Sequence, residues 1–321
     1  MRTIEDLIVK DKDFAEAMEG EILPLLKEIA KDGYLTSKDG LKLHYQYYIN
    51  PQEKASIVIS HGFCEFISKF AETIYYFYQM GYSVFMIEHR GHGLSDRQVQ
   101  SYSIVHVNHF EDYVDDFNLF IEKVVVPESL TEHLYLFGHS MGGAIGALYL
   151  EKYPKVFEKA VLTSPMLELS LSSNNKFVIN LLCLLSYLPF FNKKFIPGHH
   201  EYDHKYKFPH CSTMTKARYN YVYNEREREP HYRSNGASFG WGREAVNVSK
   251  KILKNAHLVK IPVILMQASL DNLVSPEGHA VFASKAVNCR VIRFEECKHE
   301  IFNATDDIIL EYYKDLYEFF E

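Results

Sequence analysis

The chain has little of what marks membrane-spanning, secreted or nucleic-acid-binding proteins. Its most apolar stretch, residues 177–191, contains Asn180 and Pro189 and falls short of the roughly 20 apolar residues that a helix needs to cross a bilayer. No apolar segment of signal-peptide length precedes Asp11. The 35 Lys and Arg residues are outnumbered by 42 Asp and Glu, and the net charge of -7 gives no basic surface for nucleic acid. We therefore expect a cytoplasmic protein with no nucleic-acid partner.

Cysteine is scarce, and its spacing suggests no disulfide framework. The five cysteines, an odd number, include no C-x-x-C pair, so we interpret them as free thiols in a reducing compartment. The other metal-binding residue types gather in the His-rich run at residues 198–204, whose spacing matches no familiar metal site. We interpret this run as a solvated loop and expect neither a metal ion nor another cofactor.

Apolar and charged residues occur in ordinary proportions. With 47% apolar and 24% charged residues, the chain of 321 residues can form a substantial core. Short β-rich runs alternate with helix-length patterns, as expected of a mostly parallel sheet that is covered by helices on both faces. Strands are predicted at residues 41–48, 56–60, 83–87, 134–137, 160–163, 262–266 and 290–294, and helices at residues 66–79, 110–125, 141–153, 277–287 and 305–320.

The alternation of strands and helices is interrupted between residues 166 and 255. This stretch is rich in Tyr, His and charged residues, and it contains one leucine-rich helical pattern at residues 181–185. We interpret the stretch as an inserted, mainly helical cap subdomain. The predicted organisation is a first core part at residues 1–165, with an N-terminal helical extension to about residue 31, then the cap at residues 166–255 and a second core part at residues 256–321.

The segment Gly138-His139-Ser140-Met141-Gly142-Gly143 lies between a predicted strand and a predicted helix. A G-x-S-x-G sequence in this position forms a sharp turn that lifts the serine hydroxyl above the sheet, and the small residues beside it leave room for the turn. The helix that follows presents the amide of Met141 to developing negative charge. Ser140 is therefore the predicted nucleophile, and the Met141 amide is the first predicted oxyanion donor.

A nucleophilic serine needs a histidine base, and the base needs a carboxylate that holds it in one tautomer. In proteins with this turn, the acid follows a late strand and the histidine follows the last strand. Asp271 comes after the strand at 262–266 and His299 after the strand at 290–294, in the required order. We predict that Asp271 and His299 complete a catalytic triad with Ser140. Weaker alternatives, which lie within a helix pattern or at the end of a strand, are Glu277, His279, Glu295 and Glu296.

A second oxyanion donor is expected in the loop after the strand at 56–60, where the sequence is His61-Gly62-Phe63-Cys64-Glu65. The amide of Phe63 is the predicted donor, while His61 and Gly62 shape the turn. A turn with a purely structural role is the alternative. We interpret the neighbouring Cys64 as a buried, unreactive thiol rather than a site of thiol modification.

Four stretches together resemble the branch of the α/β-hydrolase superfamily that contains bacterial lysophospholipases and monoacylglycerol lipases. They are residues 61–65, the run Glu88-His89-Arg90-Gly91-His92-Gly93-Leu94-Ser95, residues 138–143, and Asp271 with Lys298-His299-Glu300. Segments 213–219 and 239–245 also resemble caps of the lysophospholipase subgroup. The chain departs from the common pattern at Glu88, where Asp is frequent, and at Cys64-Glu65-Phe66, where Gly-Glu-His is usual.

The resemblance implies an α/β-hydrolase fold and hydrolysis of a single-chain lipid ester, with lysophospholipid ahead of monoacylglycerol. An acyl chain needs an apolar tunnel, and we expect it beneath the cap, lined by Leu181, Leu184, Leu185 and Trp241. The alternative is that these leucines only pack the cap onto the core. A short-chain carboxylesterase, a peptidase and a non-enzymatic binding protein are alternative functions on the same scaffold. A transient contact of the cap with a membrane surface is left open.

Overall fold

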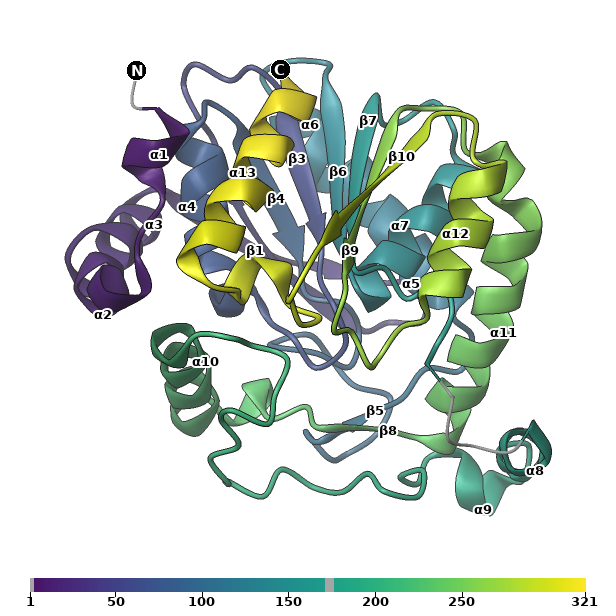
Figure 1. The fold of residues 1–321 in the computed structure, drawn as a ribbon. Helices are drawn as coiled ribbons and strands as arrows, with labels where there is room; N and C mark the ends of the chain where they lie inside the picture. The colour runs from purple at the N-terminus through teal and green to yellow at the C-terminus, as the bar shows by residue number, and fades with distance from the viewer. Residues whose placement is uncertain (1–2, 171–175) are drawn as a thin grey trace.

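The computed structural model describes residues 3–170 and 176–321, with the backbone alone for residues 176–179. Its centre is an eight-stranded sheet between two layers of helices (Figure 1). The strands of this sheet are β1 (Ala30–Thr36), β2 (Lys42–Tyr48), β3 (Ser56–Ser60), β4 (Ser83–Ile87), β6 (Leu134–His139), β7 (Lys159–Thr163), β9 (Val263–Ala268) and β10 (Cys289–Phe294). A second, two-stranded sheet pairs β5 (Ile104–Val105) with β8 (Gly236–Ala237).

The strand order of the large sheet is β1-β2-β4-β3-β6-β7-β9-β10. β2 pairs antiparallel with β1 and with β4, and the other neighbouring pairs are parallel. The carboxyl ends of the parallel strands therefore share one edge of the sheet, where the loops that follow β3, β6, β9 and β10 converge. The predicted α/β class, with a mostly parallel sheet, is confirmed.

Strand residues alternate between two apolar clusters, one on each face of the sheet. In β3, Val58 belongs to one cluster, while Ile57 and Ile59 belong to the other. Helices cover both faces, which is why the central strands are apolar on both sides. On the first face lie α5 (Glu111–Phe120) with its π-helical continuation (Ile121–Val125) and α6 (Val126–Glu128), α7 (Met141–Lys152), α11 (Phe239–Asn255) and α12 (Pro276–Lys285). On the second lie α1 (Ile4–Leu7), α2 (Phe14–Ala17), α3 (Leu23–Ile29), α4 (Ala71–Gln79) and α13 (Asp306–Phe320).

The N-terminal segment differs in part from the predicted helical extension. Its helices, joined by a π-helical turn (Met18–Ile22), end at Ile29, and β1 begins at Ala30, so residues 30 and 31 belong to a strand. The sequence did not predict β1, because the strand has no apolar run and is half-buried or exposed along its whole length. It lies at the edge of the sheet, where backbone pairing with β2 holds it in place.

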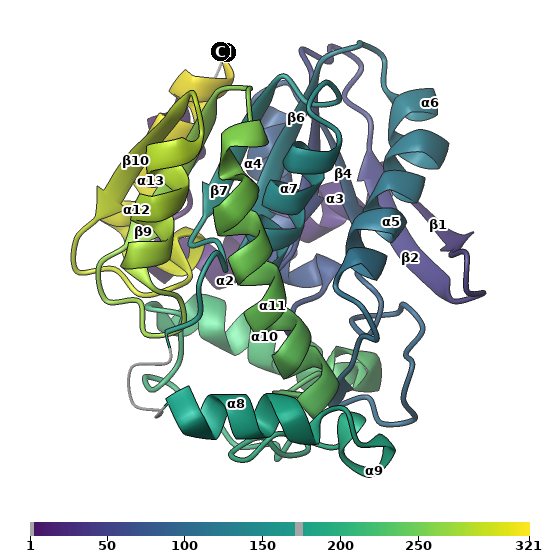
Figure 2. The ribbon, with the colours of Figure 1, turned by 90° about the vertical axis from the view of Figure 1, so that its right-hand side faces the viewer.

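The chain between β7 and β9 lies across the carboxyl edge of the sheet, in the lower part of Figure 1, and we keep the name cap for residues 166–255. Its elements are α8 (Lys176–Leu185), α9 (Pro189–Asn192), α10 (Lys216–Arg228), β8 and α11. α11 begins beside α8 and runs up along the sheet next to α7 (Figure 2). Ala245 and Val248 in α11 already belong to the core cluster, so this helix spans both parts. The domain division at residue 255 stays a prediction.

Candidate active site

Ser140 stands at the tip of a sharp turn between β6 and α7. Its backbone angles, φ 50° and ψ -116°, lie in a region that residues with a side chain rarely adopt, so the turn is strained. Gly142 packs against the backbone after β3, where a Cβ atom would overlap the carbonyl of Ser60 and come within 2.6 Å of the carbonyl oxygen of His61. Only glycine fits at this position, and the close approach keeps the serine and the β3 loop together.

His299 and Asp271 come from the loops after β10 and β9, and a hydrogen bond joins them. Nδ1 of His299 lies 2.6 Å from Oδ2 of Asp271, and both side chains are 5% exposed. Oδ1 of Asp271 accepts the amides of Leu273 and Val274 at 2.8 and 3.2 Å. Burial alone would raise the pKa of Asp271, but the His299 ring and these amides lower it below its usual value. The ionised carboxylate therefore orients the imidazole, with Nε2 pointing away from it.

Within the part of the chain that the structure describes, no hydrogen bond joins Ser140 to His299, but the turn of Ser140 and the loop of His299 lie side by side. The ring of His139, which precedes Ser140, has its centre 5.0 Å from the centre of the His299 ring. Asn272, which follows Asp271, lines the same pocket as Ser140. Catalytic hydrogen bonds are often long before substrate binds. The turn and loops that carry the three predicted triad residues thus meet at the carboxyl edge of the sheet.

The amides of Phe63 and Met141 are free to bind an anion beside Ser140. Neither amide donates a hydrogen bond within residues 3–170 and 176–321. On the β3 loop, the amide of Gly62 is occupied by Oε2 of Glu65 at 2.5 Å, whereas Phe63, the next residue, has a free amide and lines the pocket together with Ser140. Burial raises the pKa of the neighbouring Cys64 to about 12, so this thiol stays protonated and unreactive at neutral pH.

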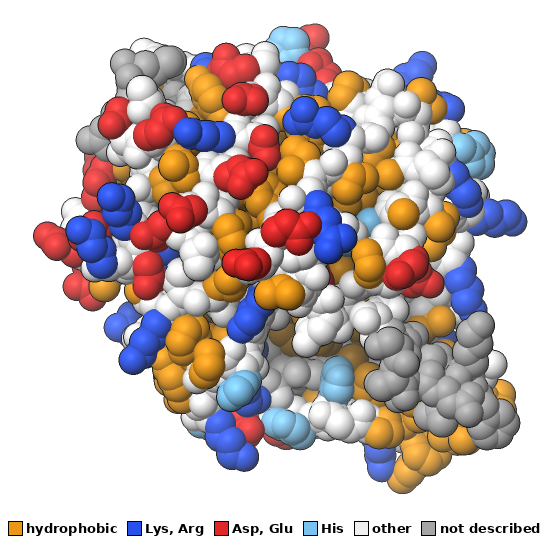
Figure 3. Space-filling model, in the orientation of Figure 1, with side chains coloured by type: hydrophobic (Ala, Val, Ile, Leu, Met, Phe, Trp, Pro, Cys, Tyr) orange, Lys and Arg blue, Asp and Glu red, His pale blue; other side chains and the backbone are white. Residues whose placement is uncertain are grey.

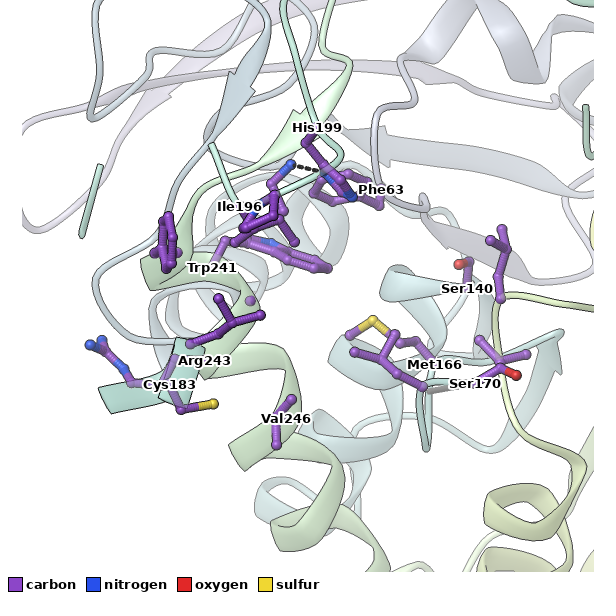
Figure 4. A pocket seen from close by; sticks show the side chains of 18 of the residues that line it. Phe63, Ser140, Met166, Ser170, Cys183, Ile196, His199, Trp241, Arg243 and Val246 are labelled. Carbon is purple, nitrogen blue, oxygen red and sulfur yellow. Dashed lines mark hydrogen bonds between the residues drawn. The ribbon is translucent and has the colours of Figure 1, made fainter. Parts of the chain in front are cut away.

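A pocket of about 400 Å³ opens over Ser140. Figure 4 shows Ser140 and Met166 on one side of the open space, with Ile196 and Trp241 on the other. The volume is within the range of small-molecule sites, about 300–1,000 Å³. Because most of its lining is apolar, the pocket can take up a hydrocarbon chain next to the serine hydroxyl.

One predicted set of substrate-binding residues needs correction: Trp241 lines the pocket, but Leu181, Leu184 and Leu185 do not. Leu181 and Leu184 are 43% and 66% exposed. The face of α8 that meets the pocket carries Leu182 and Cys183 instead. The sequence indicated an apolar helix but could not fix its rotation, because the apolar residues at 177–179 and 181–185 together occur around most of its circumference. The side chains of residues 177–179, in the same apolar run, lie outside the described residues.

Glu88 organises two loops of the site, although the sequence showed it only as a departure from a common Asp. It is fully buried at the end of β4 and accepts the amides of Ile67 at 2.9 Å and Leu94 at 2.6 Å. Nδ1 of His44 lies 2.9 Å from the same carboxylate. Glu88 thus connects the loop after β3 to the loop at residues 90–94, which follows β4. A charged residue that directly follows an apolar strand was the available signal, because a buried carboxylate must be paired.

Two of the alternative site residues, His279 and Glu277, have partners of their own. His279 bonds the carbonyl of Pro165 at 2.8 Å, and Glu277 bonds the hydroxyl of Ser275 at 2.6 Å. In the His-rich loop, Nδ1 of His199 accepts the amide of Ala237 at 2.8 Å, and the ring lines the pocket (Figure 4). Within the described residues, no group of three or more His, Cys, Asp or Glu side chains is arranged to hold a metal ion.

Comparison with known sequences places the chain among hydrolases. Residues 51–306 match the serine aminopeptidase S33 family. Over 94% of its length, the chain is 27% identical to a probable lysophospholipase L2 of Haemophilus influenzae, of which it covers 95%. It is 29% identical to lysophospholipase L2 of Escherichia coli over 77% of this chain and 72% of that protein.

Two solved structures show the same fold. The structure covers 97% of a monoacylglycerol lipase from Paleococcus ferrophilus, with 86% of this chain aligned, a TM-score of 0.67 and 21% identity. It covers 95% of a soluble variant of monoglyceride lipase from Saccharomyces cerevisiae, with 91% of this chain aligned, a TM-score of 0.69 and 20% identity. At these identities, the likeness establishes the α/β-hydrolase architecture.

Proposed function

The chain belongs to the serine aminopeptidase S33 family of serine hydrolases, and we propose that it hydrolyses the carboxylic ester of single-chain lipids, lysophospholipids first. The observation that carries this proposal is the apolar pocket of about 400 Å³ that opens directly over the strained Ser140. The relatives named lysophospholipase L2 support the substrate class, since one of them aligns with 94% of the chain.

The proposed reaction uses the predicted triad of Ser140, His299 and Asp271. Oγ of Ser140 attacks the ester carbonyl carbon, and Nε2 of His299 takes its proton while Asp271 stabilises the imidazolium. The amides of Phe63 and Met141 hold the oxyanion of the tetrahedral intermediate. The bond to the leaving alcohol then breaks, and His299 returns the proton to the alcohol oxygen. Water attacks the acyl-enzyme by the same route in reverse, releasing the fatty acid and Ser140.

An apolar stripe on the outside of the cap supports peripheral contact with a membrane surface, from which a lipid substrate would enter. Exposed side chains of α8, α9 and the turn between them form this stripe: Leu181, Leu184, Tyr187, Leu188 and Phe190. The amine of Lys194 lies 3.5 Å from the centre of the Phe190 ring, where a cation can meet anionic headgroups. No helix in the described residues is long and apolar enough to span a membrane.

We propose a cytoplasmic location for the same reason that the sequence suggested it. All five cysteines are unpaired, as expected in a reducing compartment. Acidic and basic side chains are interspersed over the face shown in Figure 3, which fits the absence of nucleic acid from the proposed partners. Separation of cell membranes from the soluble fraction, with antibody detection, would test both the location and the peripheral contact.

The experiment that tests the proposed function is a side-by-side assay of purified protein on lysophospholipids, monoacylglycerols and p-nitrophenyl esters of increasing chain length. We expect the highest kcat/KM for lysophospholipid and a preference for long over short acyl chains. A monoacylglycerol optimum would reassign the headgroup, and activity restricted to acetate and butyrate esters would indicate a short-chain carboxylesterase. Cleavage of peptide but not ester substrates would indicate a peptidase.

A fluorophosphonate probe separates an enzyme from a binding protein on the same scaffold. We expect the probe to label the protein at Ser140, with Ser140→Ala as the unlabelled control. The variant should lose activity by a factor of roughly a million, as when a triad member is removed from subtilisin. A folded protein that resists the probe and hydrolyses no ester would be a binding protein.

A further inference from the structure

A buried lysine lies behind the site and bridges two of its loops. Lys69, in the 3-10 turn Ile67–Phe70, has a side chain that is 8% exposed. Its ammonium nitrogen lies 2.7 Å from Oε1 of Glu65 and 2.8 Å from Oε1 of Glu300. A buried ammonium is unfavourable unless it is paired, so the two carboxylates together hold it in place. The lysine in turn holds two carboxylates that would otherwise repel each other.

Glu65 connects Lys69 to the loop that carries the proposed oxyanion donor. The amide of Gly62, the residue before Phe63, donates to Oε2 of Glu65 at 2.5 Å. The other carboxylate oxygen lies 3.6 Å from Nε2 of His139, the residue before Ser140. A displacement of Glu65 would therefore shift both the loop that carries Phe63 and the turn that carries Ser140, because Glu65 contacts a residue in each.

Glu300 connects Lys69 to the loop that carries the proposed base, because it directly follows His299. Its Oε2 accepts the hydroxyl of Thr213, in the cap, and the side-chain amide of Asn303, each at 2.8 Å. Burial alone would raise the pKa of Glu300, but Lys69, Asn303 and Thr213 lower it to about 2, so the group is a carboxylate throughout the neutral range. The histidine loop is thus fixed to the core and to the cap at one carboxylate.

We propose that Lys69 is a positioning residue that keeps the oxyanion loop and the histidine loop in catalytic register with Ser140 by pairing with Glu65 and Glu300 at once. This inference rests on the proposed function, since it gives Lys69 a part in the chemistry of that site. Lys69 is not among the residues that line the pocket, so its effect passes through the two carboxylates. Acyl transfer needs the oxyanion donors and the base in place together, and a misplacement of about 1 Å can lower a rate about 100-fold.

The substitution Lys69→Met tests this proposal, because it removes the ammonium and keeps most of the side-chain length. On p-nitrophenyl butyrate, we expect kcat to fall about 100-fold while KM changes by less than about threefold, since positioning affects the chemical step more than binding. The same fall should appear in the rate constant of fluorophosphonate labelling. Lys69→Arg keeps a cation that can bridge two carboxylates, and it should recover at least about tenfold of the lost kcat.

A second substitution in the same background separates positioning from a general loss of packing. In Lys69→Met, no cation lies between the carboxylates of Glu65 and Glu300, and removing one charge with Glu300→Gln relieves their repulsion. The double variant should therefore have a higher kcat than Lys69→Met, by about fivefold. If Lys69→Met does not fold, the near-isosteric single variant Glu300→Gln tests the proposal instead. We expect its kcat to fall about tenfold at unchanged KM.

Arg218→Met is the matched control. Arg218 is a similarly buried cation, 1% exposed, and pairs with Glu72 at 2.7 Å, where α10 meets α4. Its loss should lower Tm and leave kcat of the folded protein within about twofold of wild type. The proposal is overturned if folded Lys69→Met keeps the wild-type kcat, if its loss lies in KM, or if Glu300→Gln makes the double variant worse.

The choice of substrate keeps this proposal distinct from the proposed function. p-Nitrophenyl butyrate and the fluorophosphonate report the serine chemistry without a lipid headgroup. A wild-type protein that cleaves butyrate but no lysophospholipid overturns the substrate assignment and leaves the test of Lys69 intact. A wild-type protein that is inert to both reagents overturns the proposed function itself.

Discussion

At the scale of single residues, the site depends on a few contacts that tolerate almost no change. The hydrogen bond of 2.6 Å between His299 and Asp271 sets the tautomer of the imidazole, because Nδ1 must carry the proton that Asp271 accepts. The Nε2 atom is then unprotonated and can take the proton of Ser140. Two further amides on Asp271 fix the carboxylate itself.

Asp271→Asn should preserve the geometry and reverse the tautomer. The amide nitrogen can donate to Nδ1, which leaves the proton on Nε2, where it blocks the base. We expect kcat to fall about 10⁴-fold at neutral pH, the effect of the corresponding change in trypsin, with little change in Tm. Steady-state kinetics on p-nitrophenyl butyrate measure the fall, and a residual rate within tenfold of wild type would contradict the role given to Asp271.

Gly142→Ala should damage the site through packing alone. The added Cβ would overlap the carbonyl of Ser60 and approach the carbonyl oxygen of His61 to 2.6 Å, and neither backbone group can rotate away. We expect a loss of about 1–3 kcal/mol in the free energy of unfolding, typical of overpacking, and a loss of most activity as the β3 loop moves. Gly20→Ala is the control, because nothing lies within 4 Å of a Cβ there. Thermal unfolding and steady-state kinetics of both variants test this prediction. Equal losses of stability and activity in Gly142→Ala and Gly20→Ala would contradict it.

The site residues that could be predicted from their order and spacing in the sequence are those that the sheet topology brings together. Ser140, Asp271 and His299 each follow a strand, so parallel pairing alone predicts that they meet at one edge. Lys69 and Glu300 gave no comparable signal, because their contact depends on side-chain reach between the turn before α4 and the loop after β10. A sequence pattern reports which face a residue lies on but not which distant charge it will meet.

At the scale of elements, the sequence pattern predicted the strands of the large sheet that have apolar runs and missed the one that has none. β1 was missed, since backbone pairing rather than apolar burial holds it at the edge. α8 was found, but its rotation was wrong. Leu182 and Cys183 line the pocket, whereas Leu181 and Leu184 point outward. Hydrophobic periodicity predicts the rotation of a helix that has one apolar face, but α8 has two apolar faces.

The outward face of α8, together with the adjoining α9, should therefore serve a different step from the face of α8 that lines the pocket. Leu184→Ser combined with Phe190→Ser, at side chains that are 66% and 68% exposed, should weaken binding to phosphatidylglycerol vesicles by at least about tenfold, because apolar area is lost from the membrane contact. Hydrolysis of soluble p-nitrophenyl butyrate should stay unchanged. Vesicle sedimentation measures the binding, with Leu130→Ser as the control at another exposed leucine, 60% exposed. Unaltered sedimentation of the double variant would remove the stripe from the proposed membrane contact.

At the scale of the whole molecule, the cap and the core are joined by polar contacts as well as by apolar packing. β5 of the core pairs with β8 of the cap, Arg218 of α10 pairs with Glu72 of α4, and Thr213 bonds Glu300. The sequence pattern predicted an inserted subdomain but none of these contacts. Each contact joins residues that are far apart in sequence and depends on their positions in the folded chain. The stability of the molecule therefore depends on buried charges, and so on pH.

Glu151, in the last turn of α7, should make the molecule less stable as the pH rises. It is 8% exposed, and neither carboxylate oxygen has a hydrogen-bond partner among the described residues. Lys251, the cation that acts to lower the pKa of Glu151, is occupied by Glu111 at 2.6 Å. Burial raises the pKa of Glu151 to about 8, above its usual value of 4.5. Between these values the folded chain binds the proton more tightly than the unfolded chain, so its stabilising effect is complete below pH 4.5 and is lost as the pH rises through 8.

Glu151→Gln removes this dependence because the amide is neutral at every pH. We expect the variant and wild type to have similar Tm at pH 5, and the variant to be the more stable at pH 8.5 by on the order of 1 to a few kcal/mol. Thermal unfolding at the two pH values measures the difference, with Glu132→Gln, at an exposed carboxylate, as the control that should show none. If the gap between Glu151→Gln and wild type does not widen from pH 5 to pH 8.5, Glu151 is ionised in the folded protein, and a cation or water must reach the end of α7.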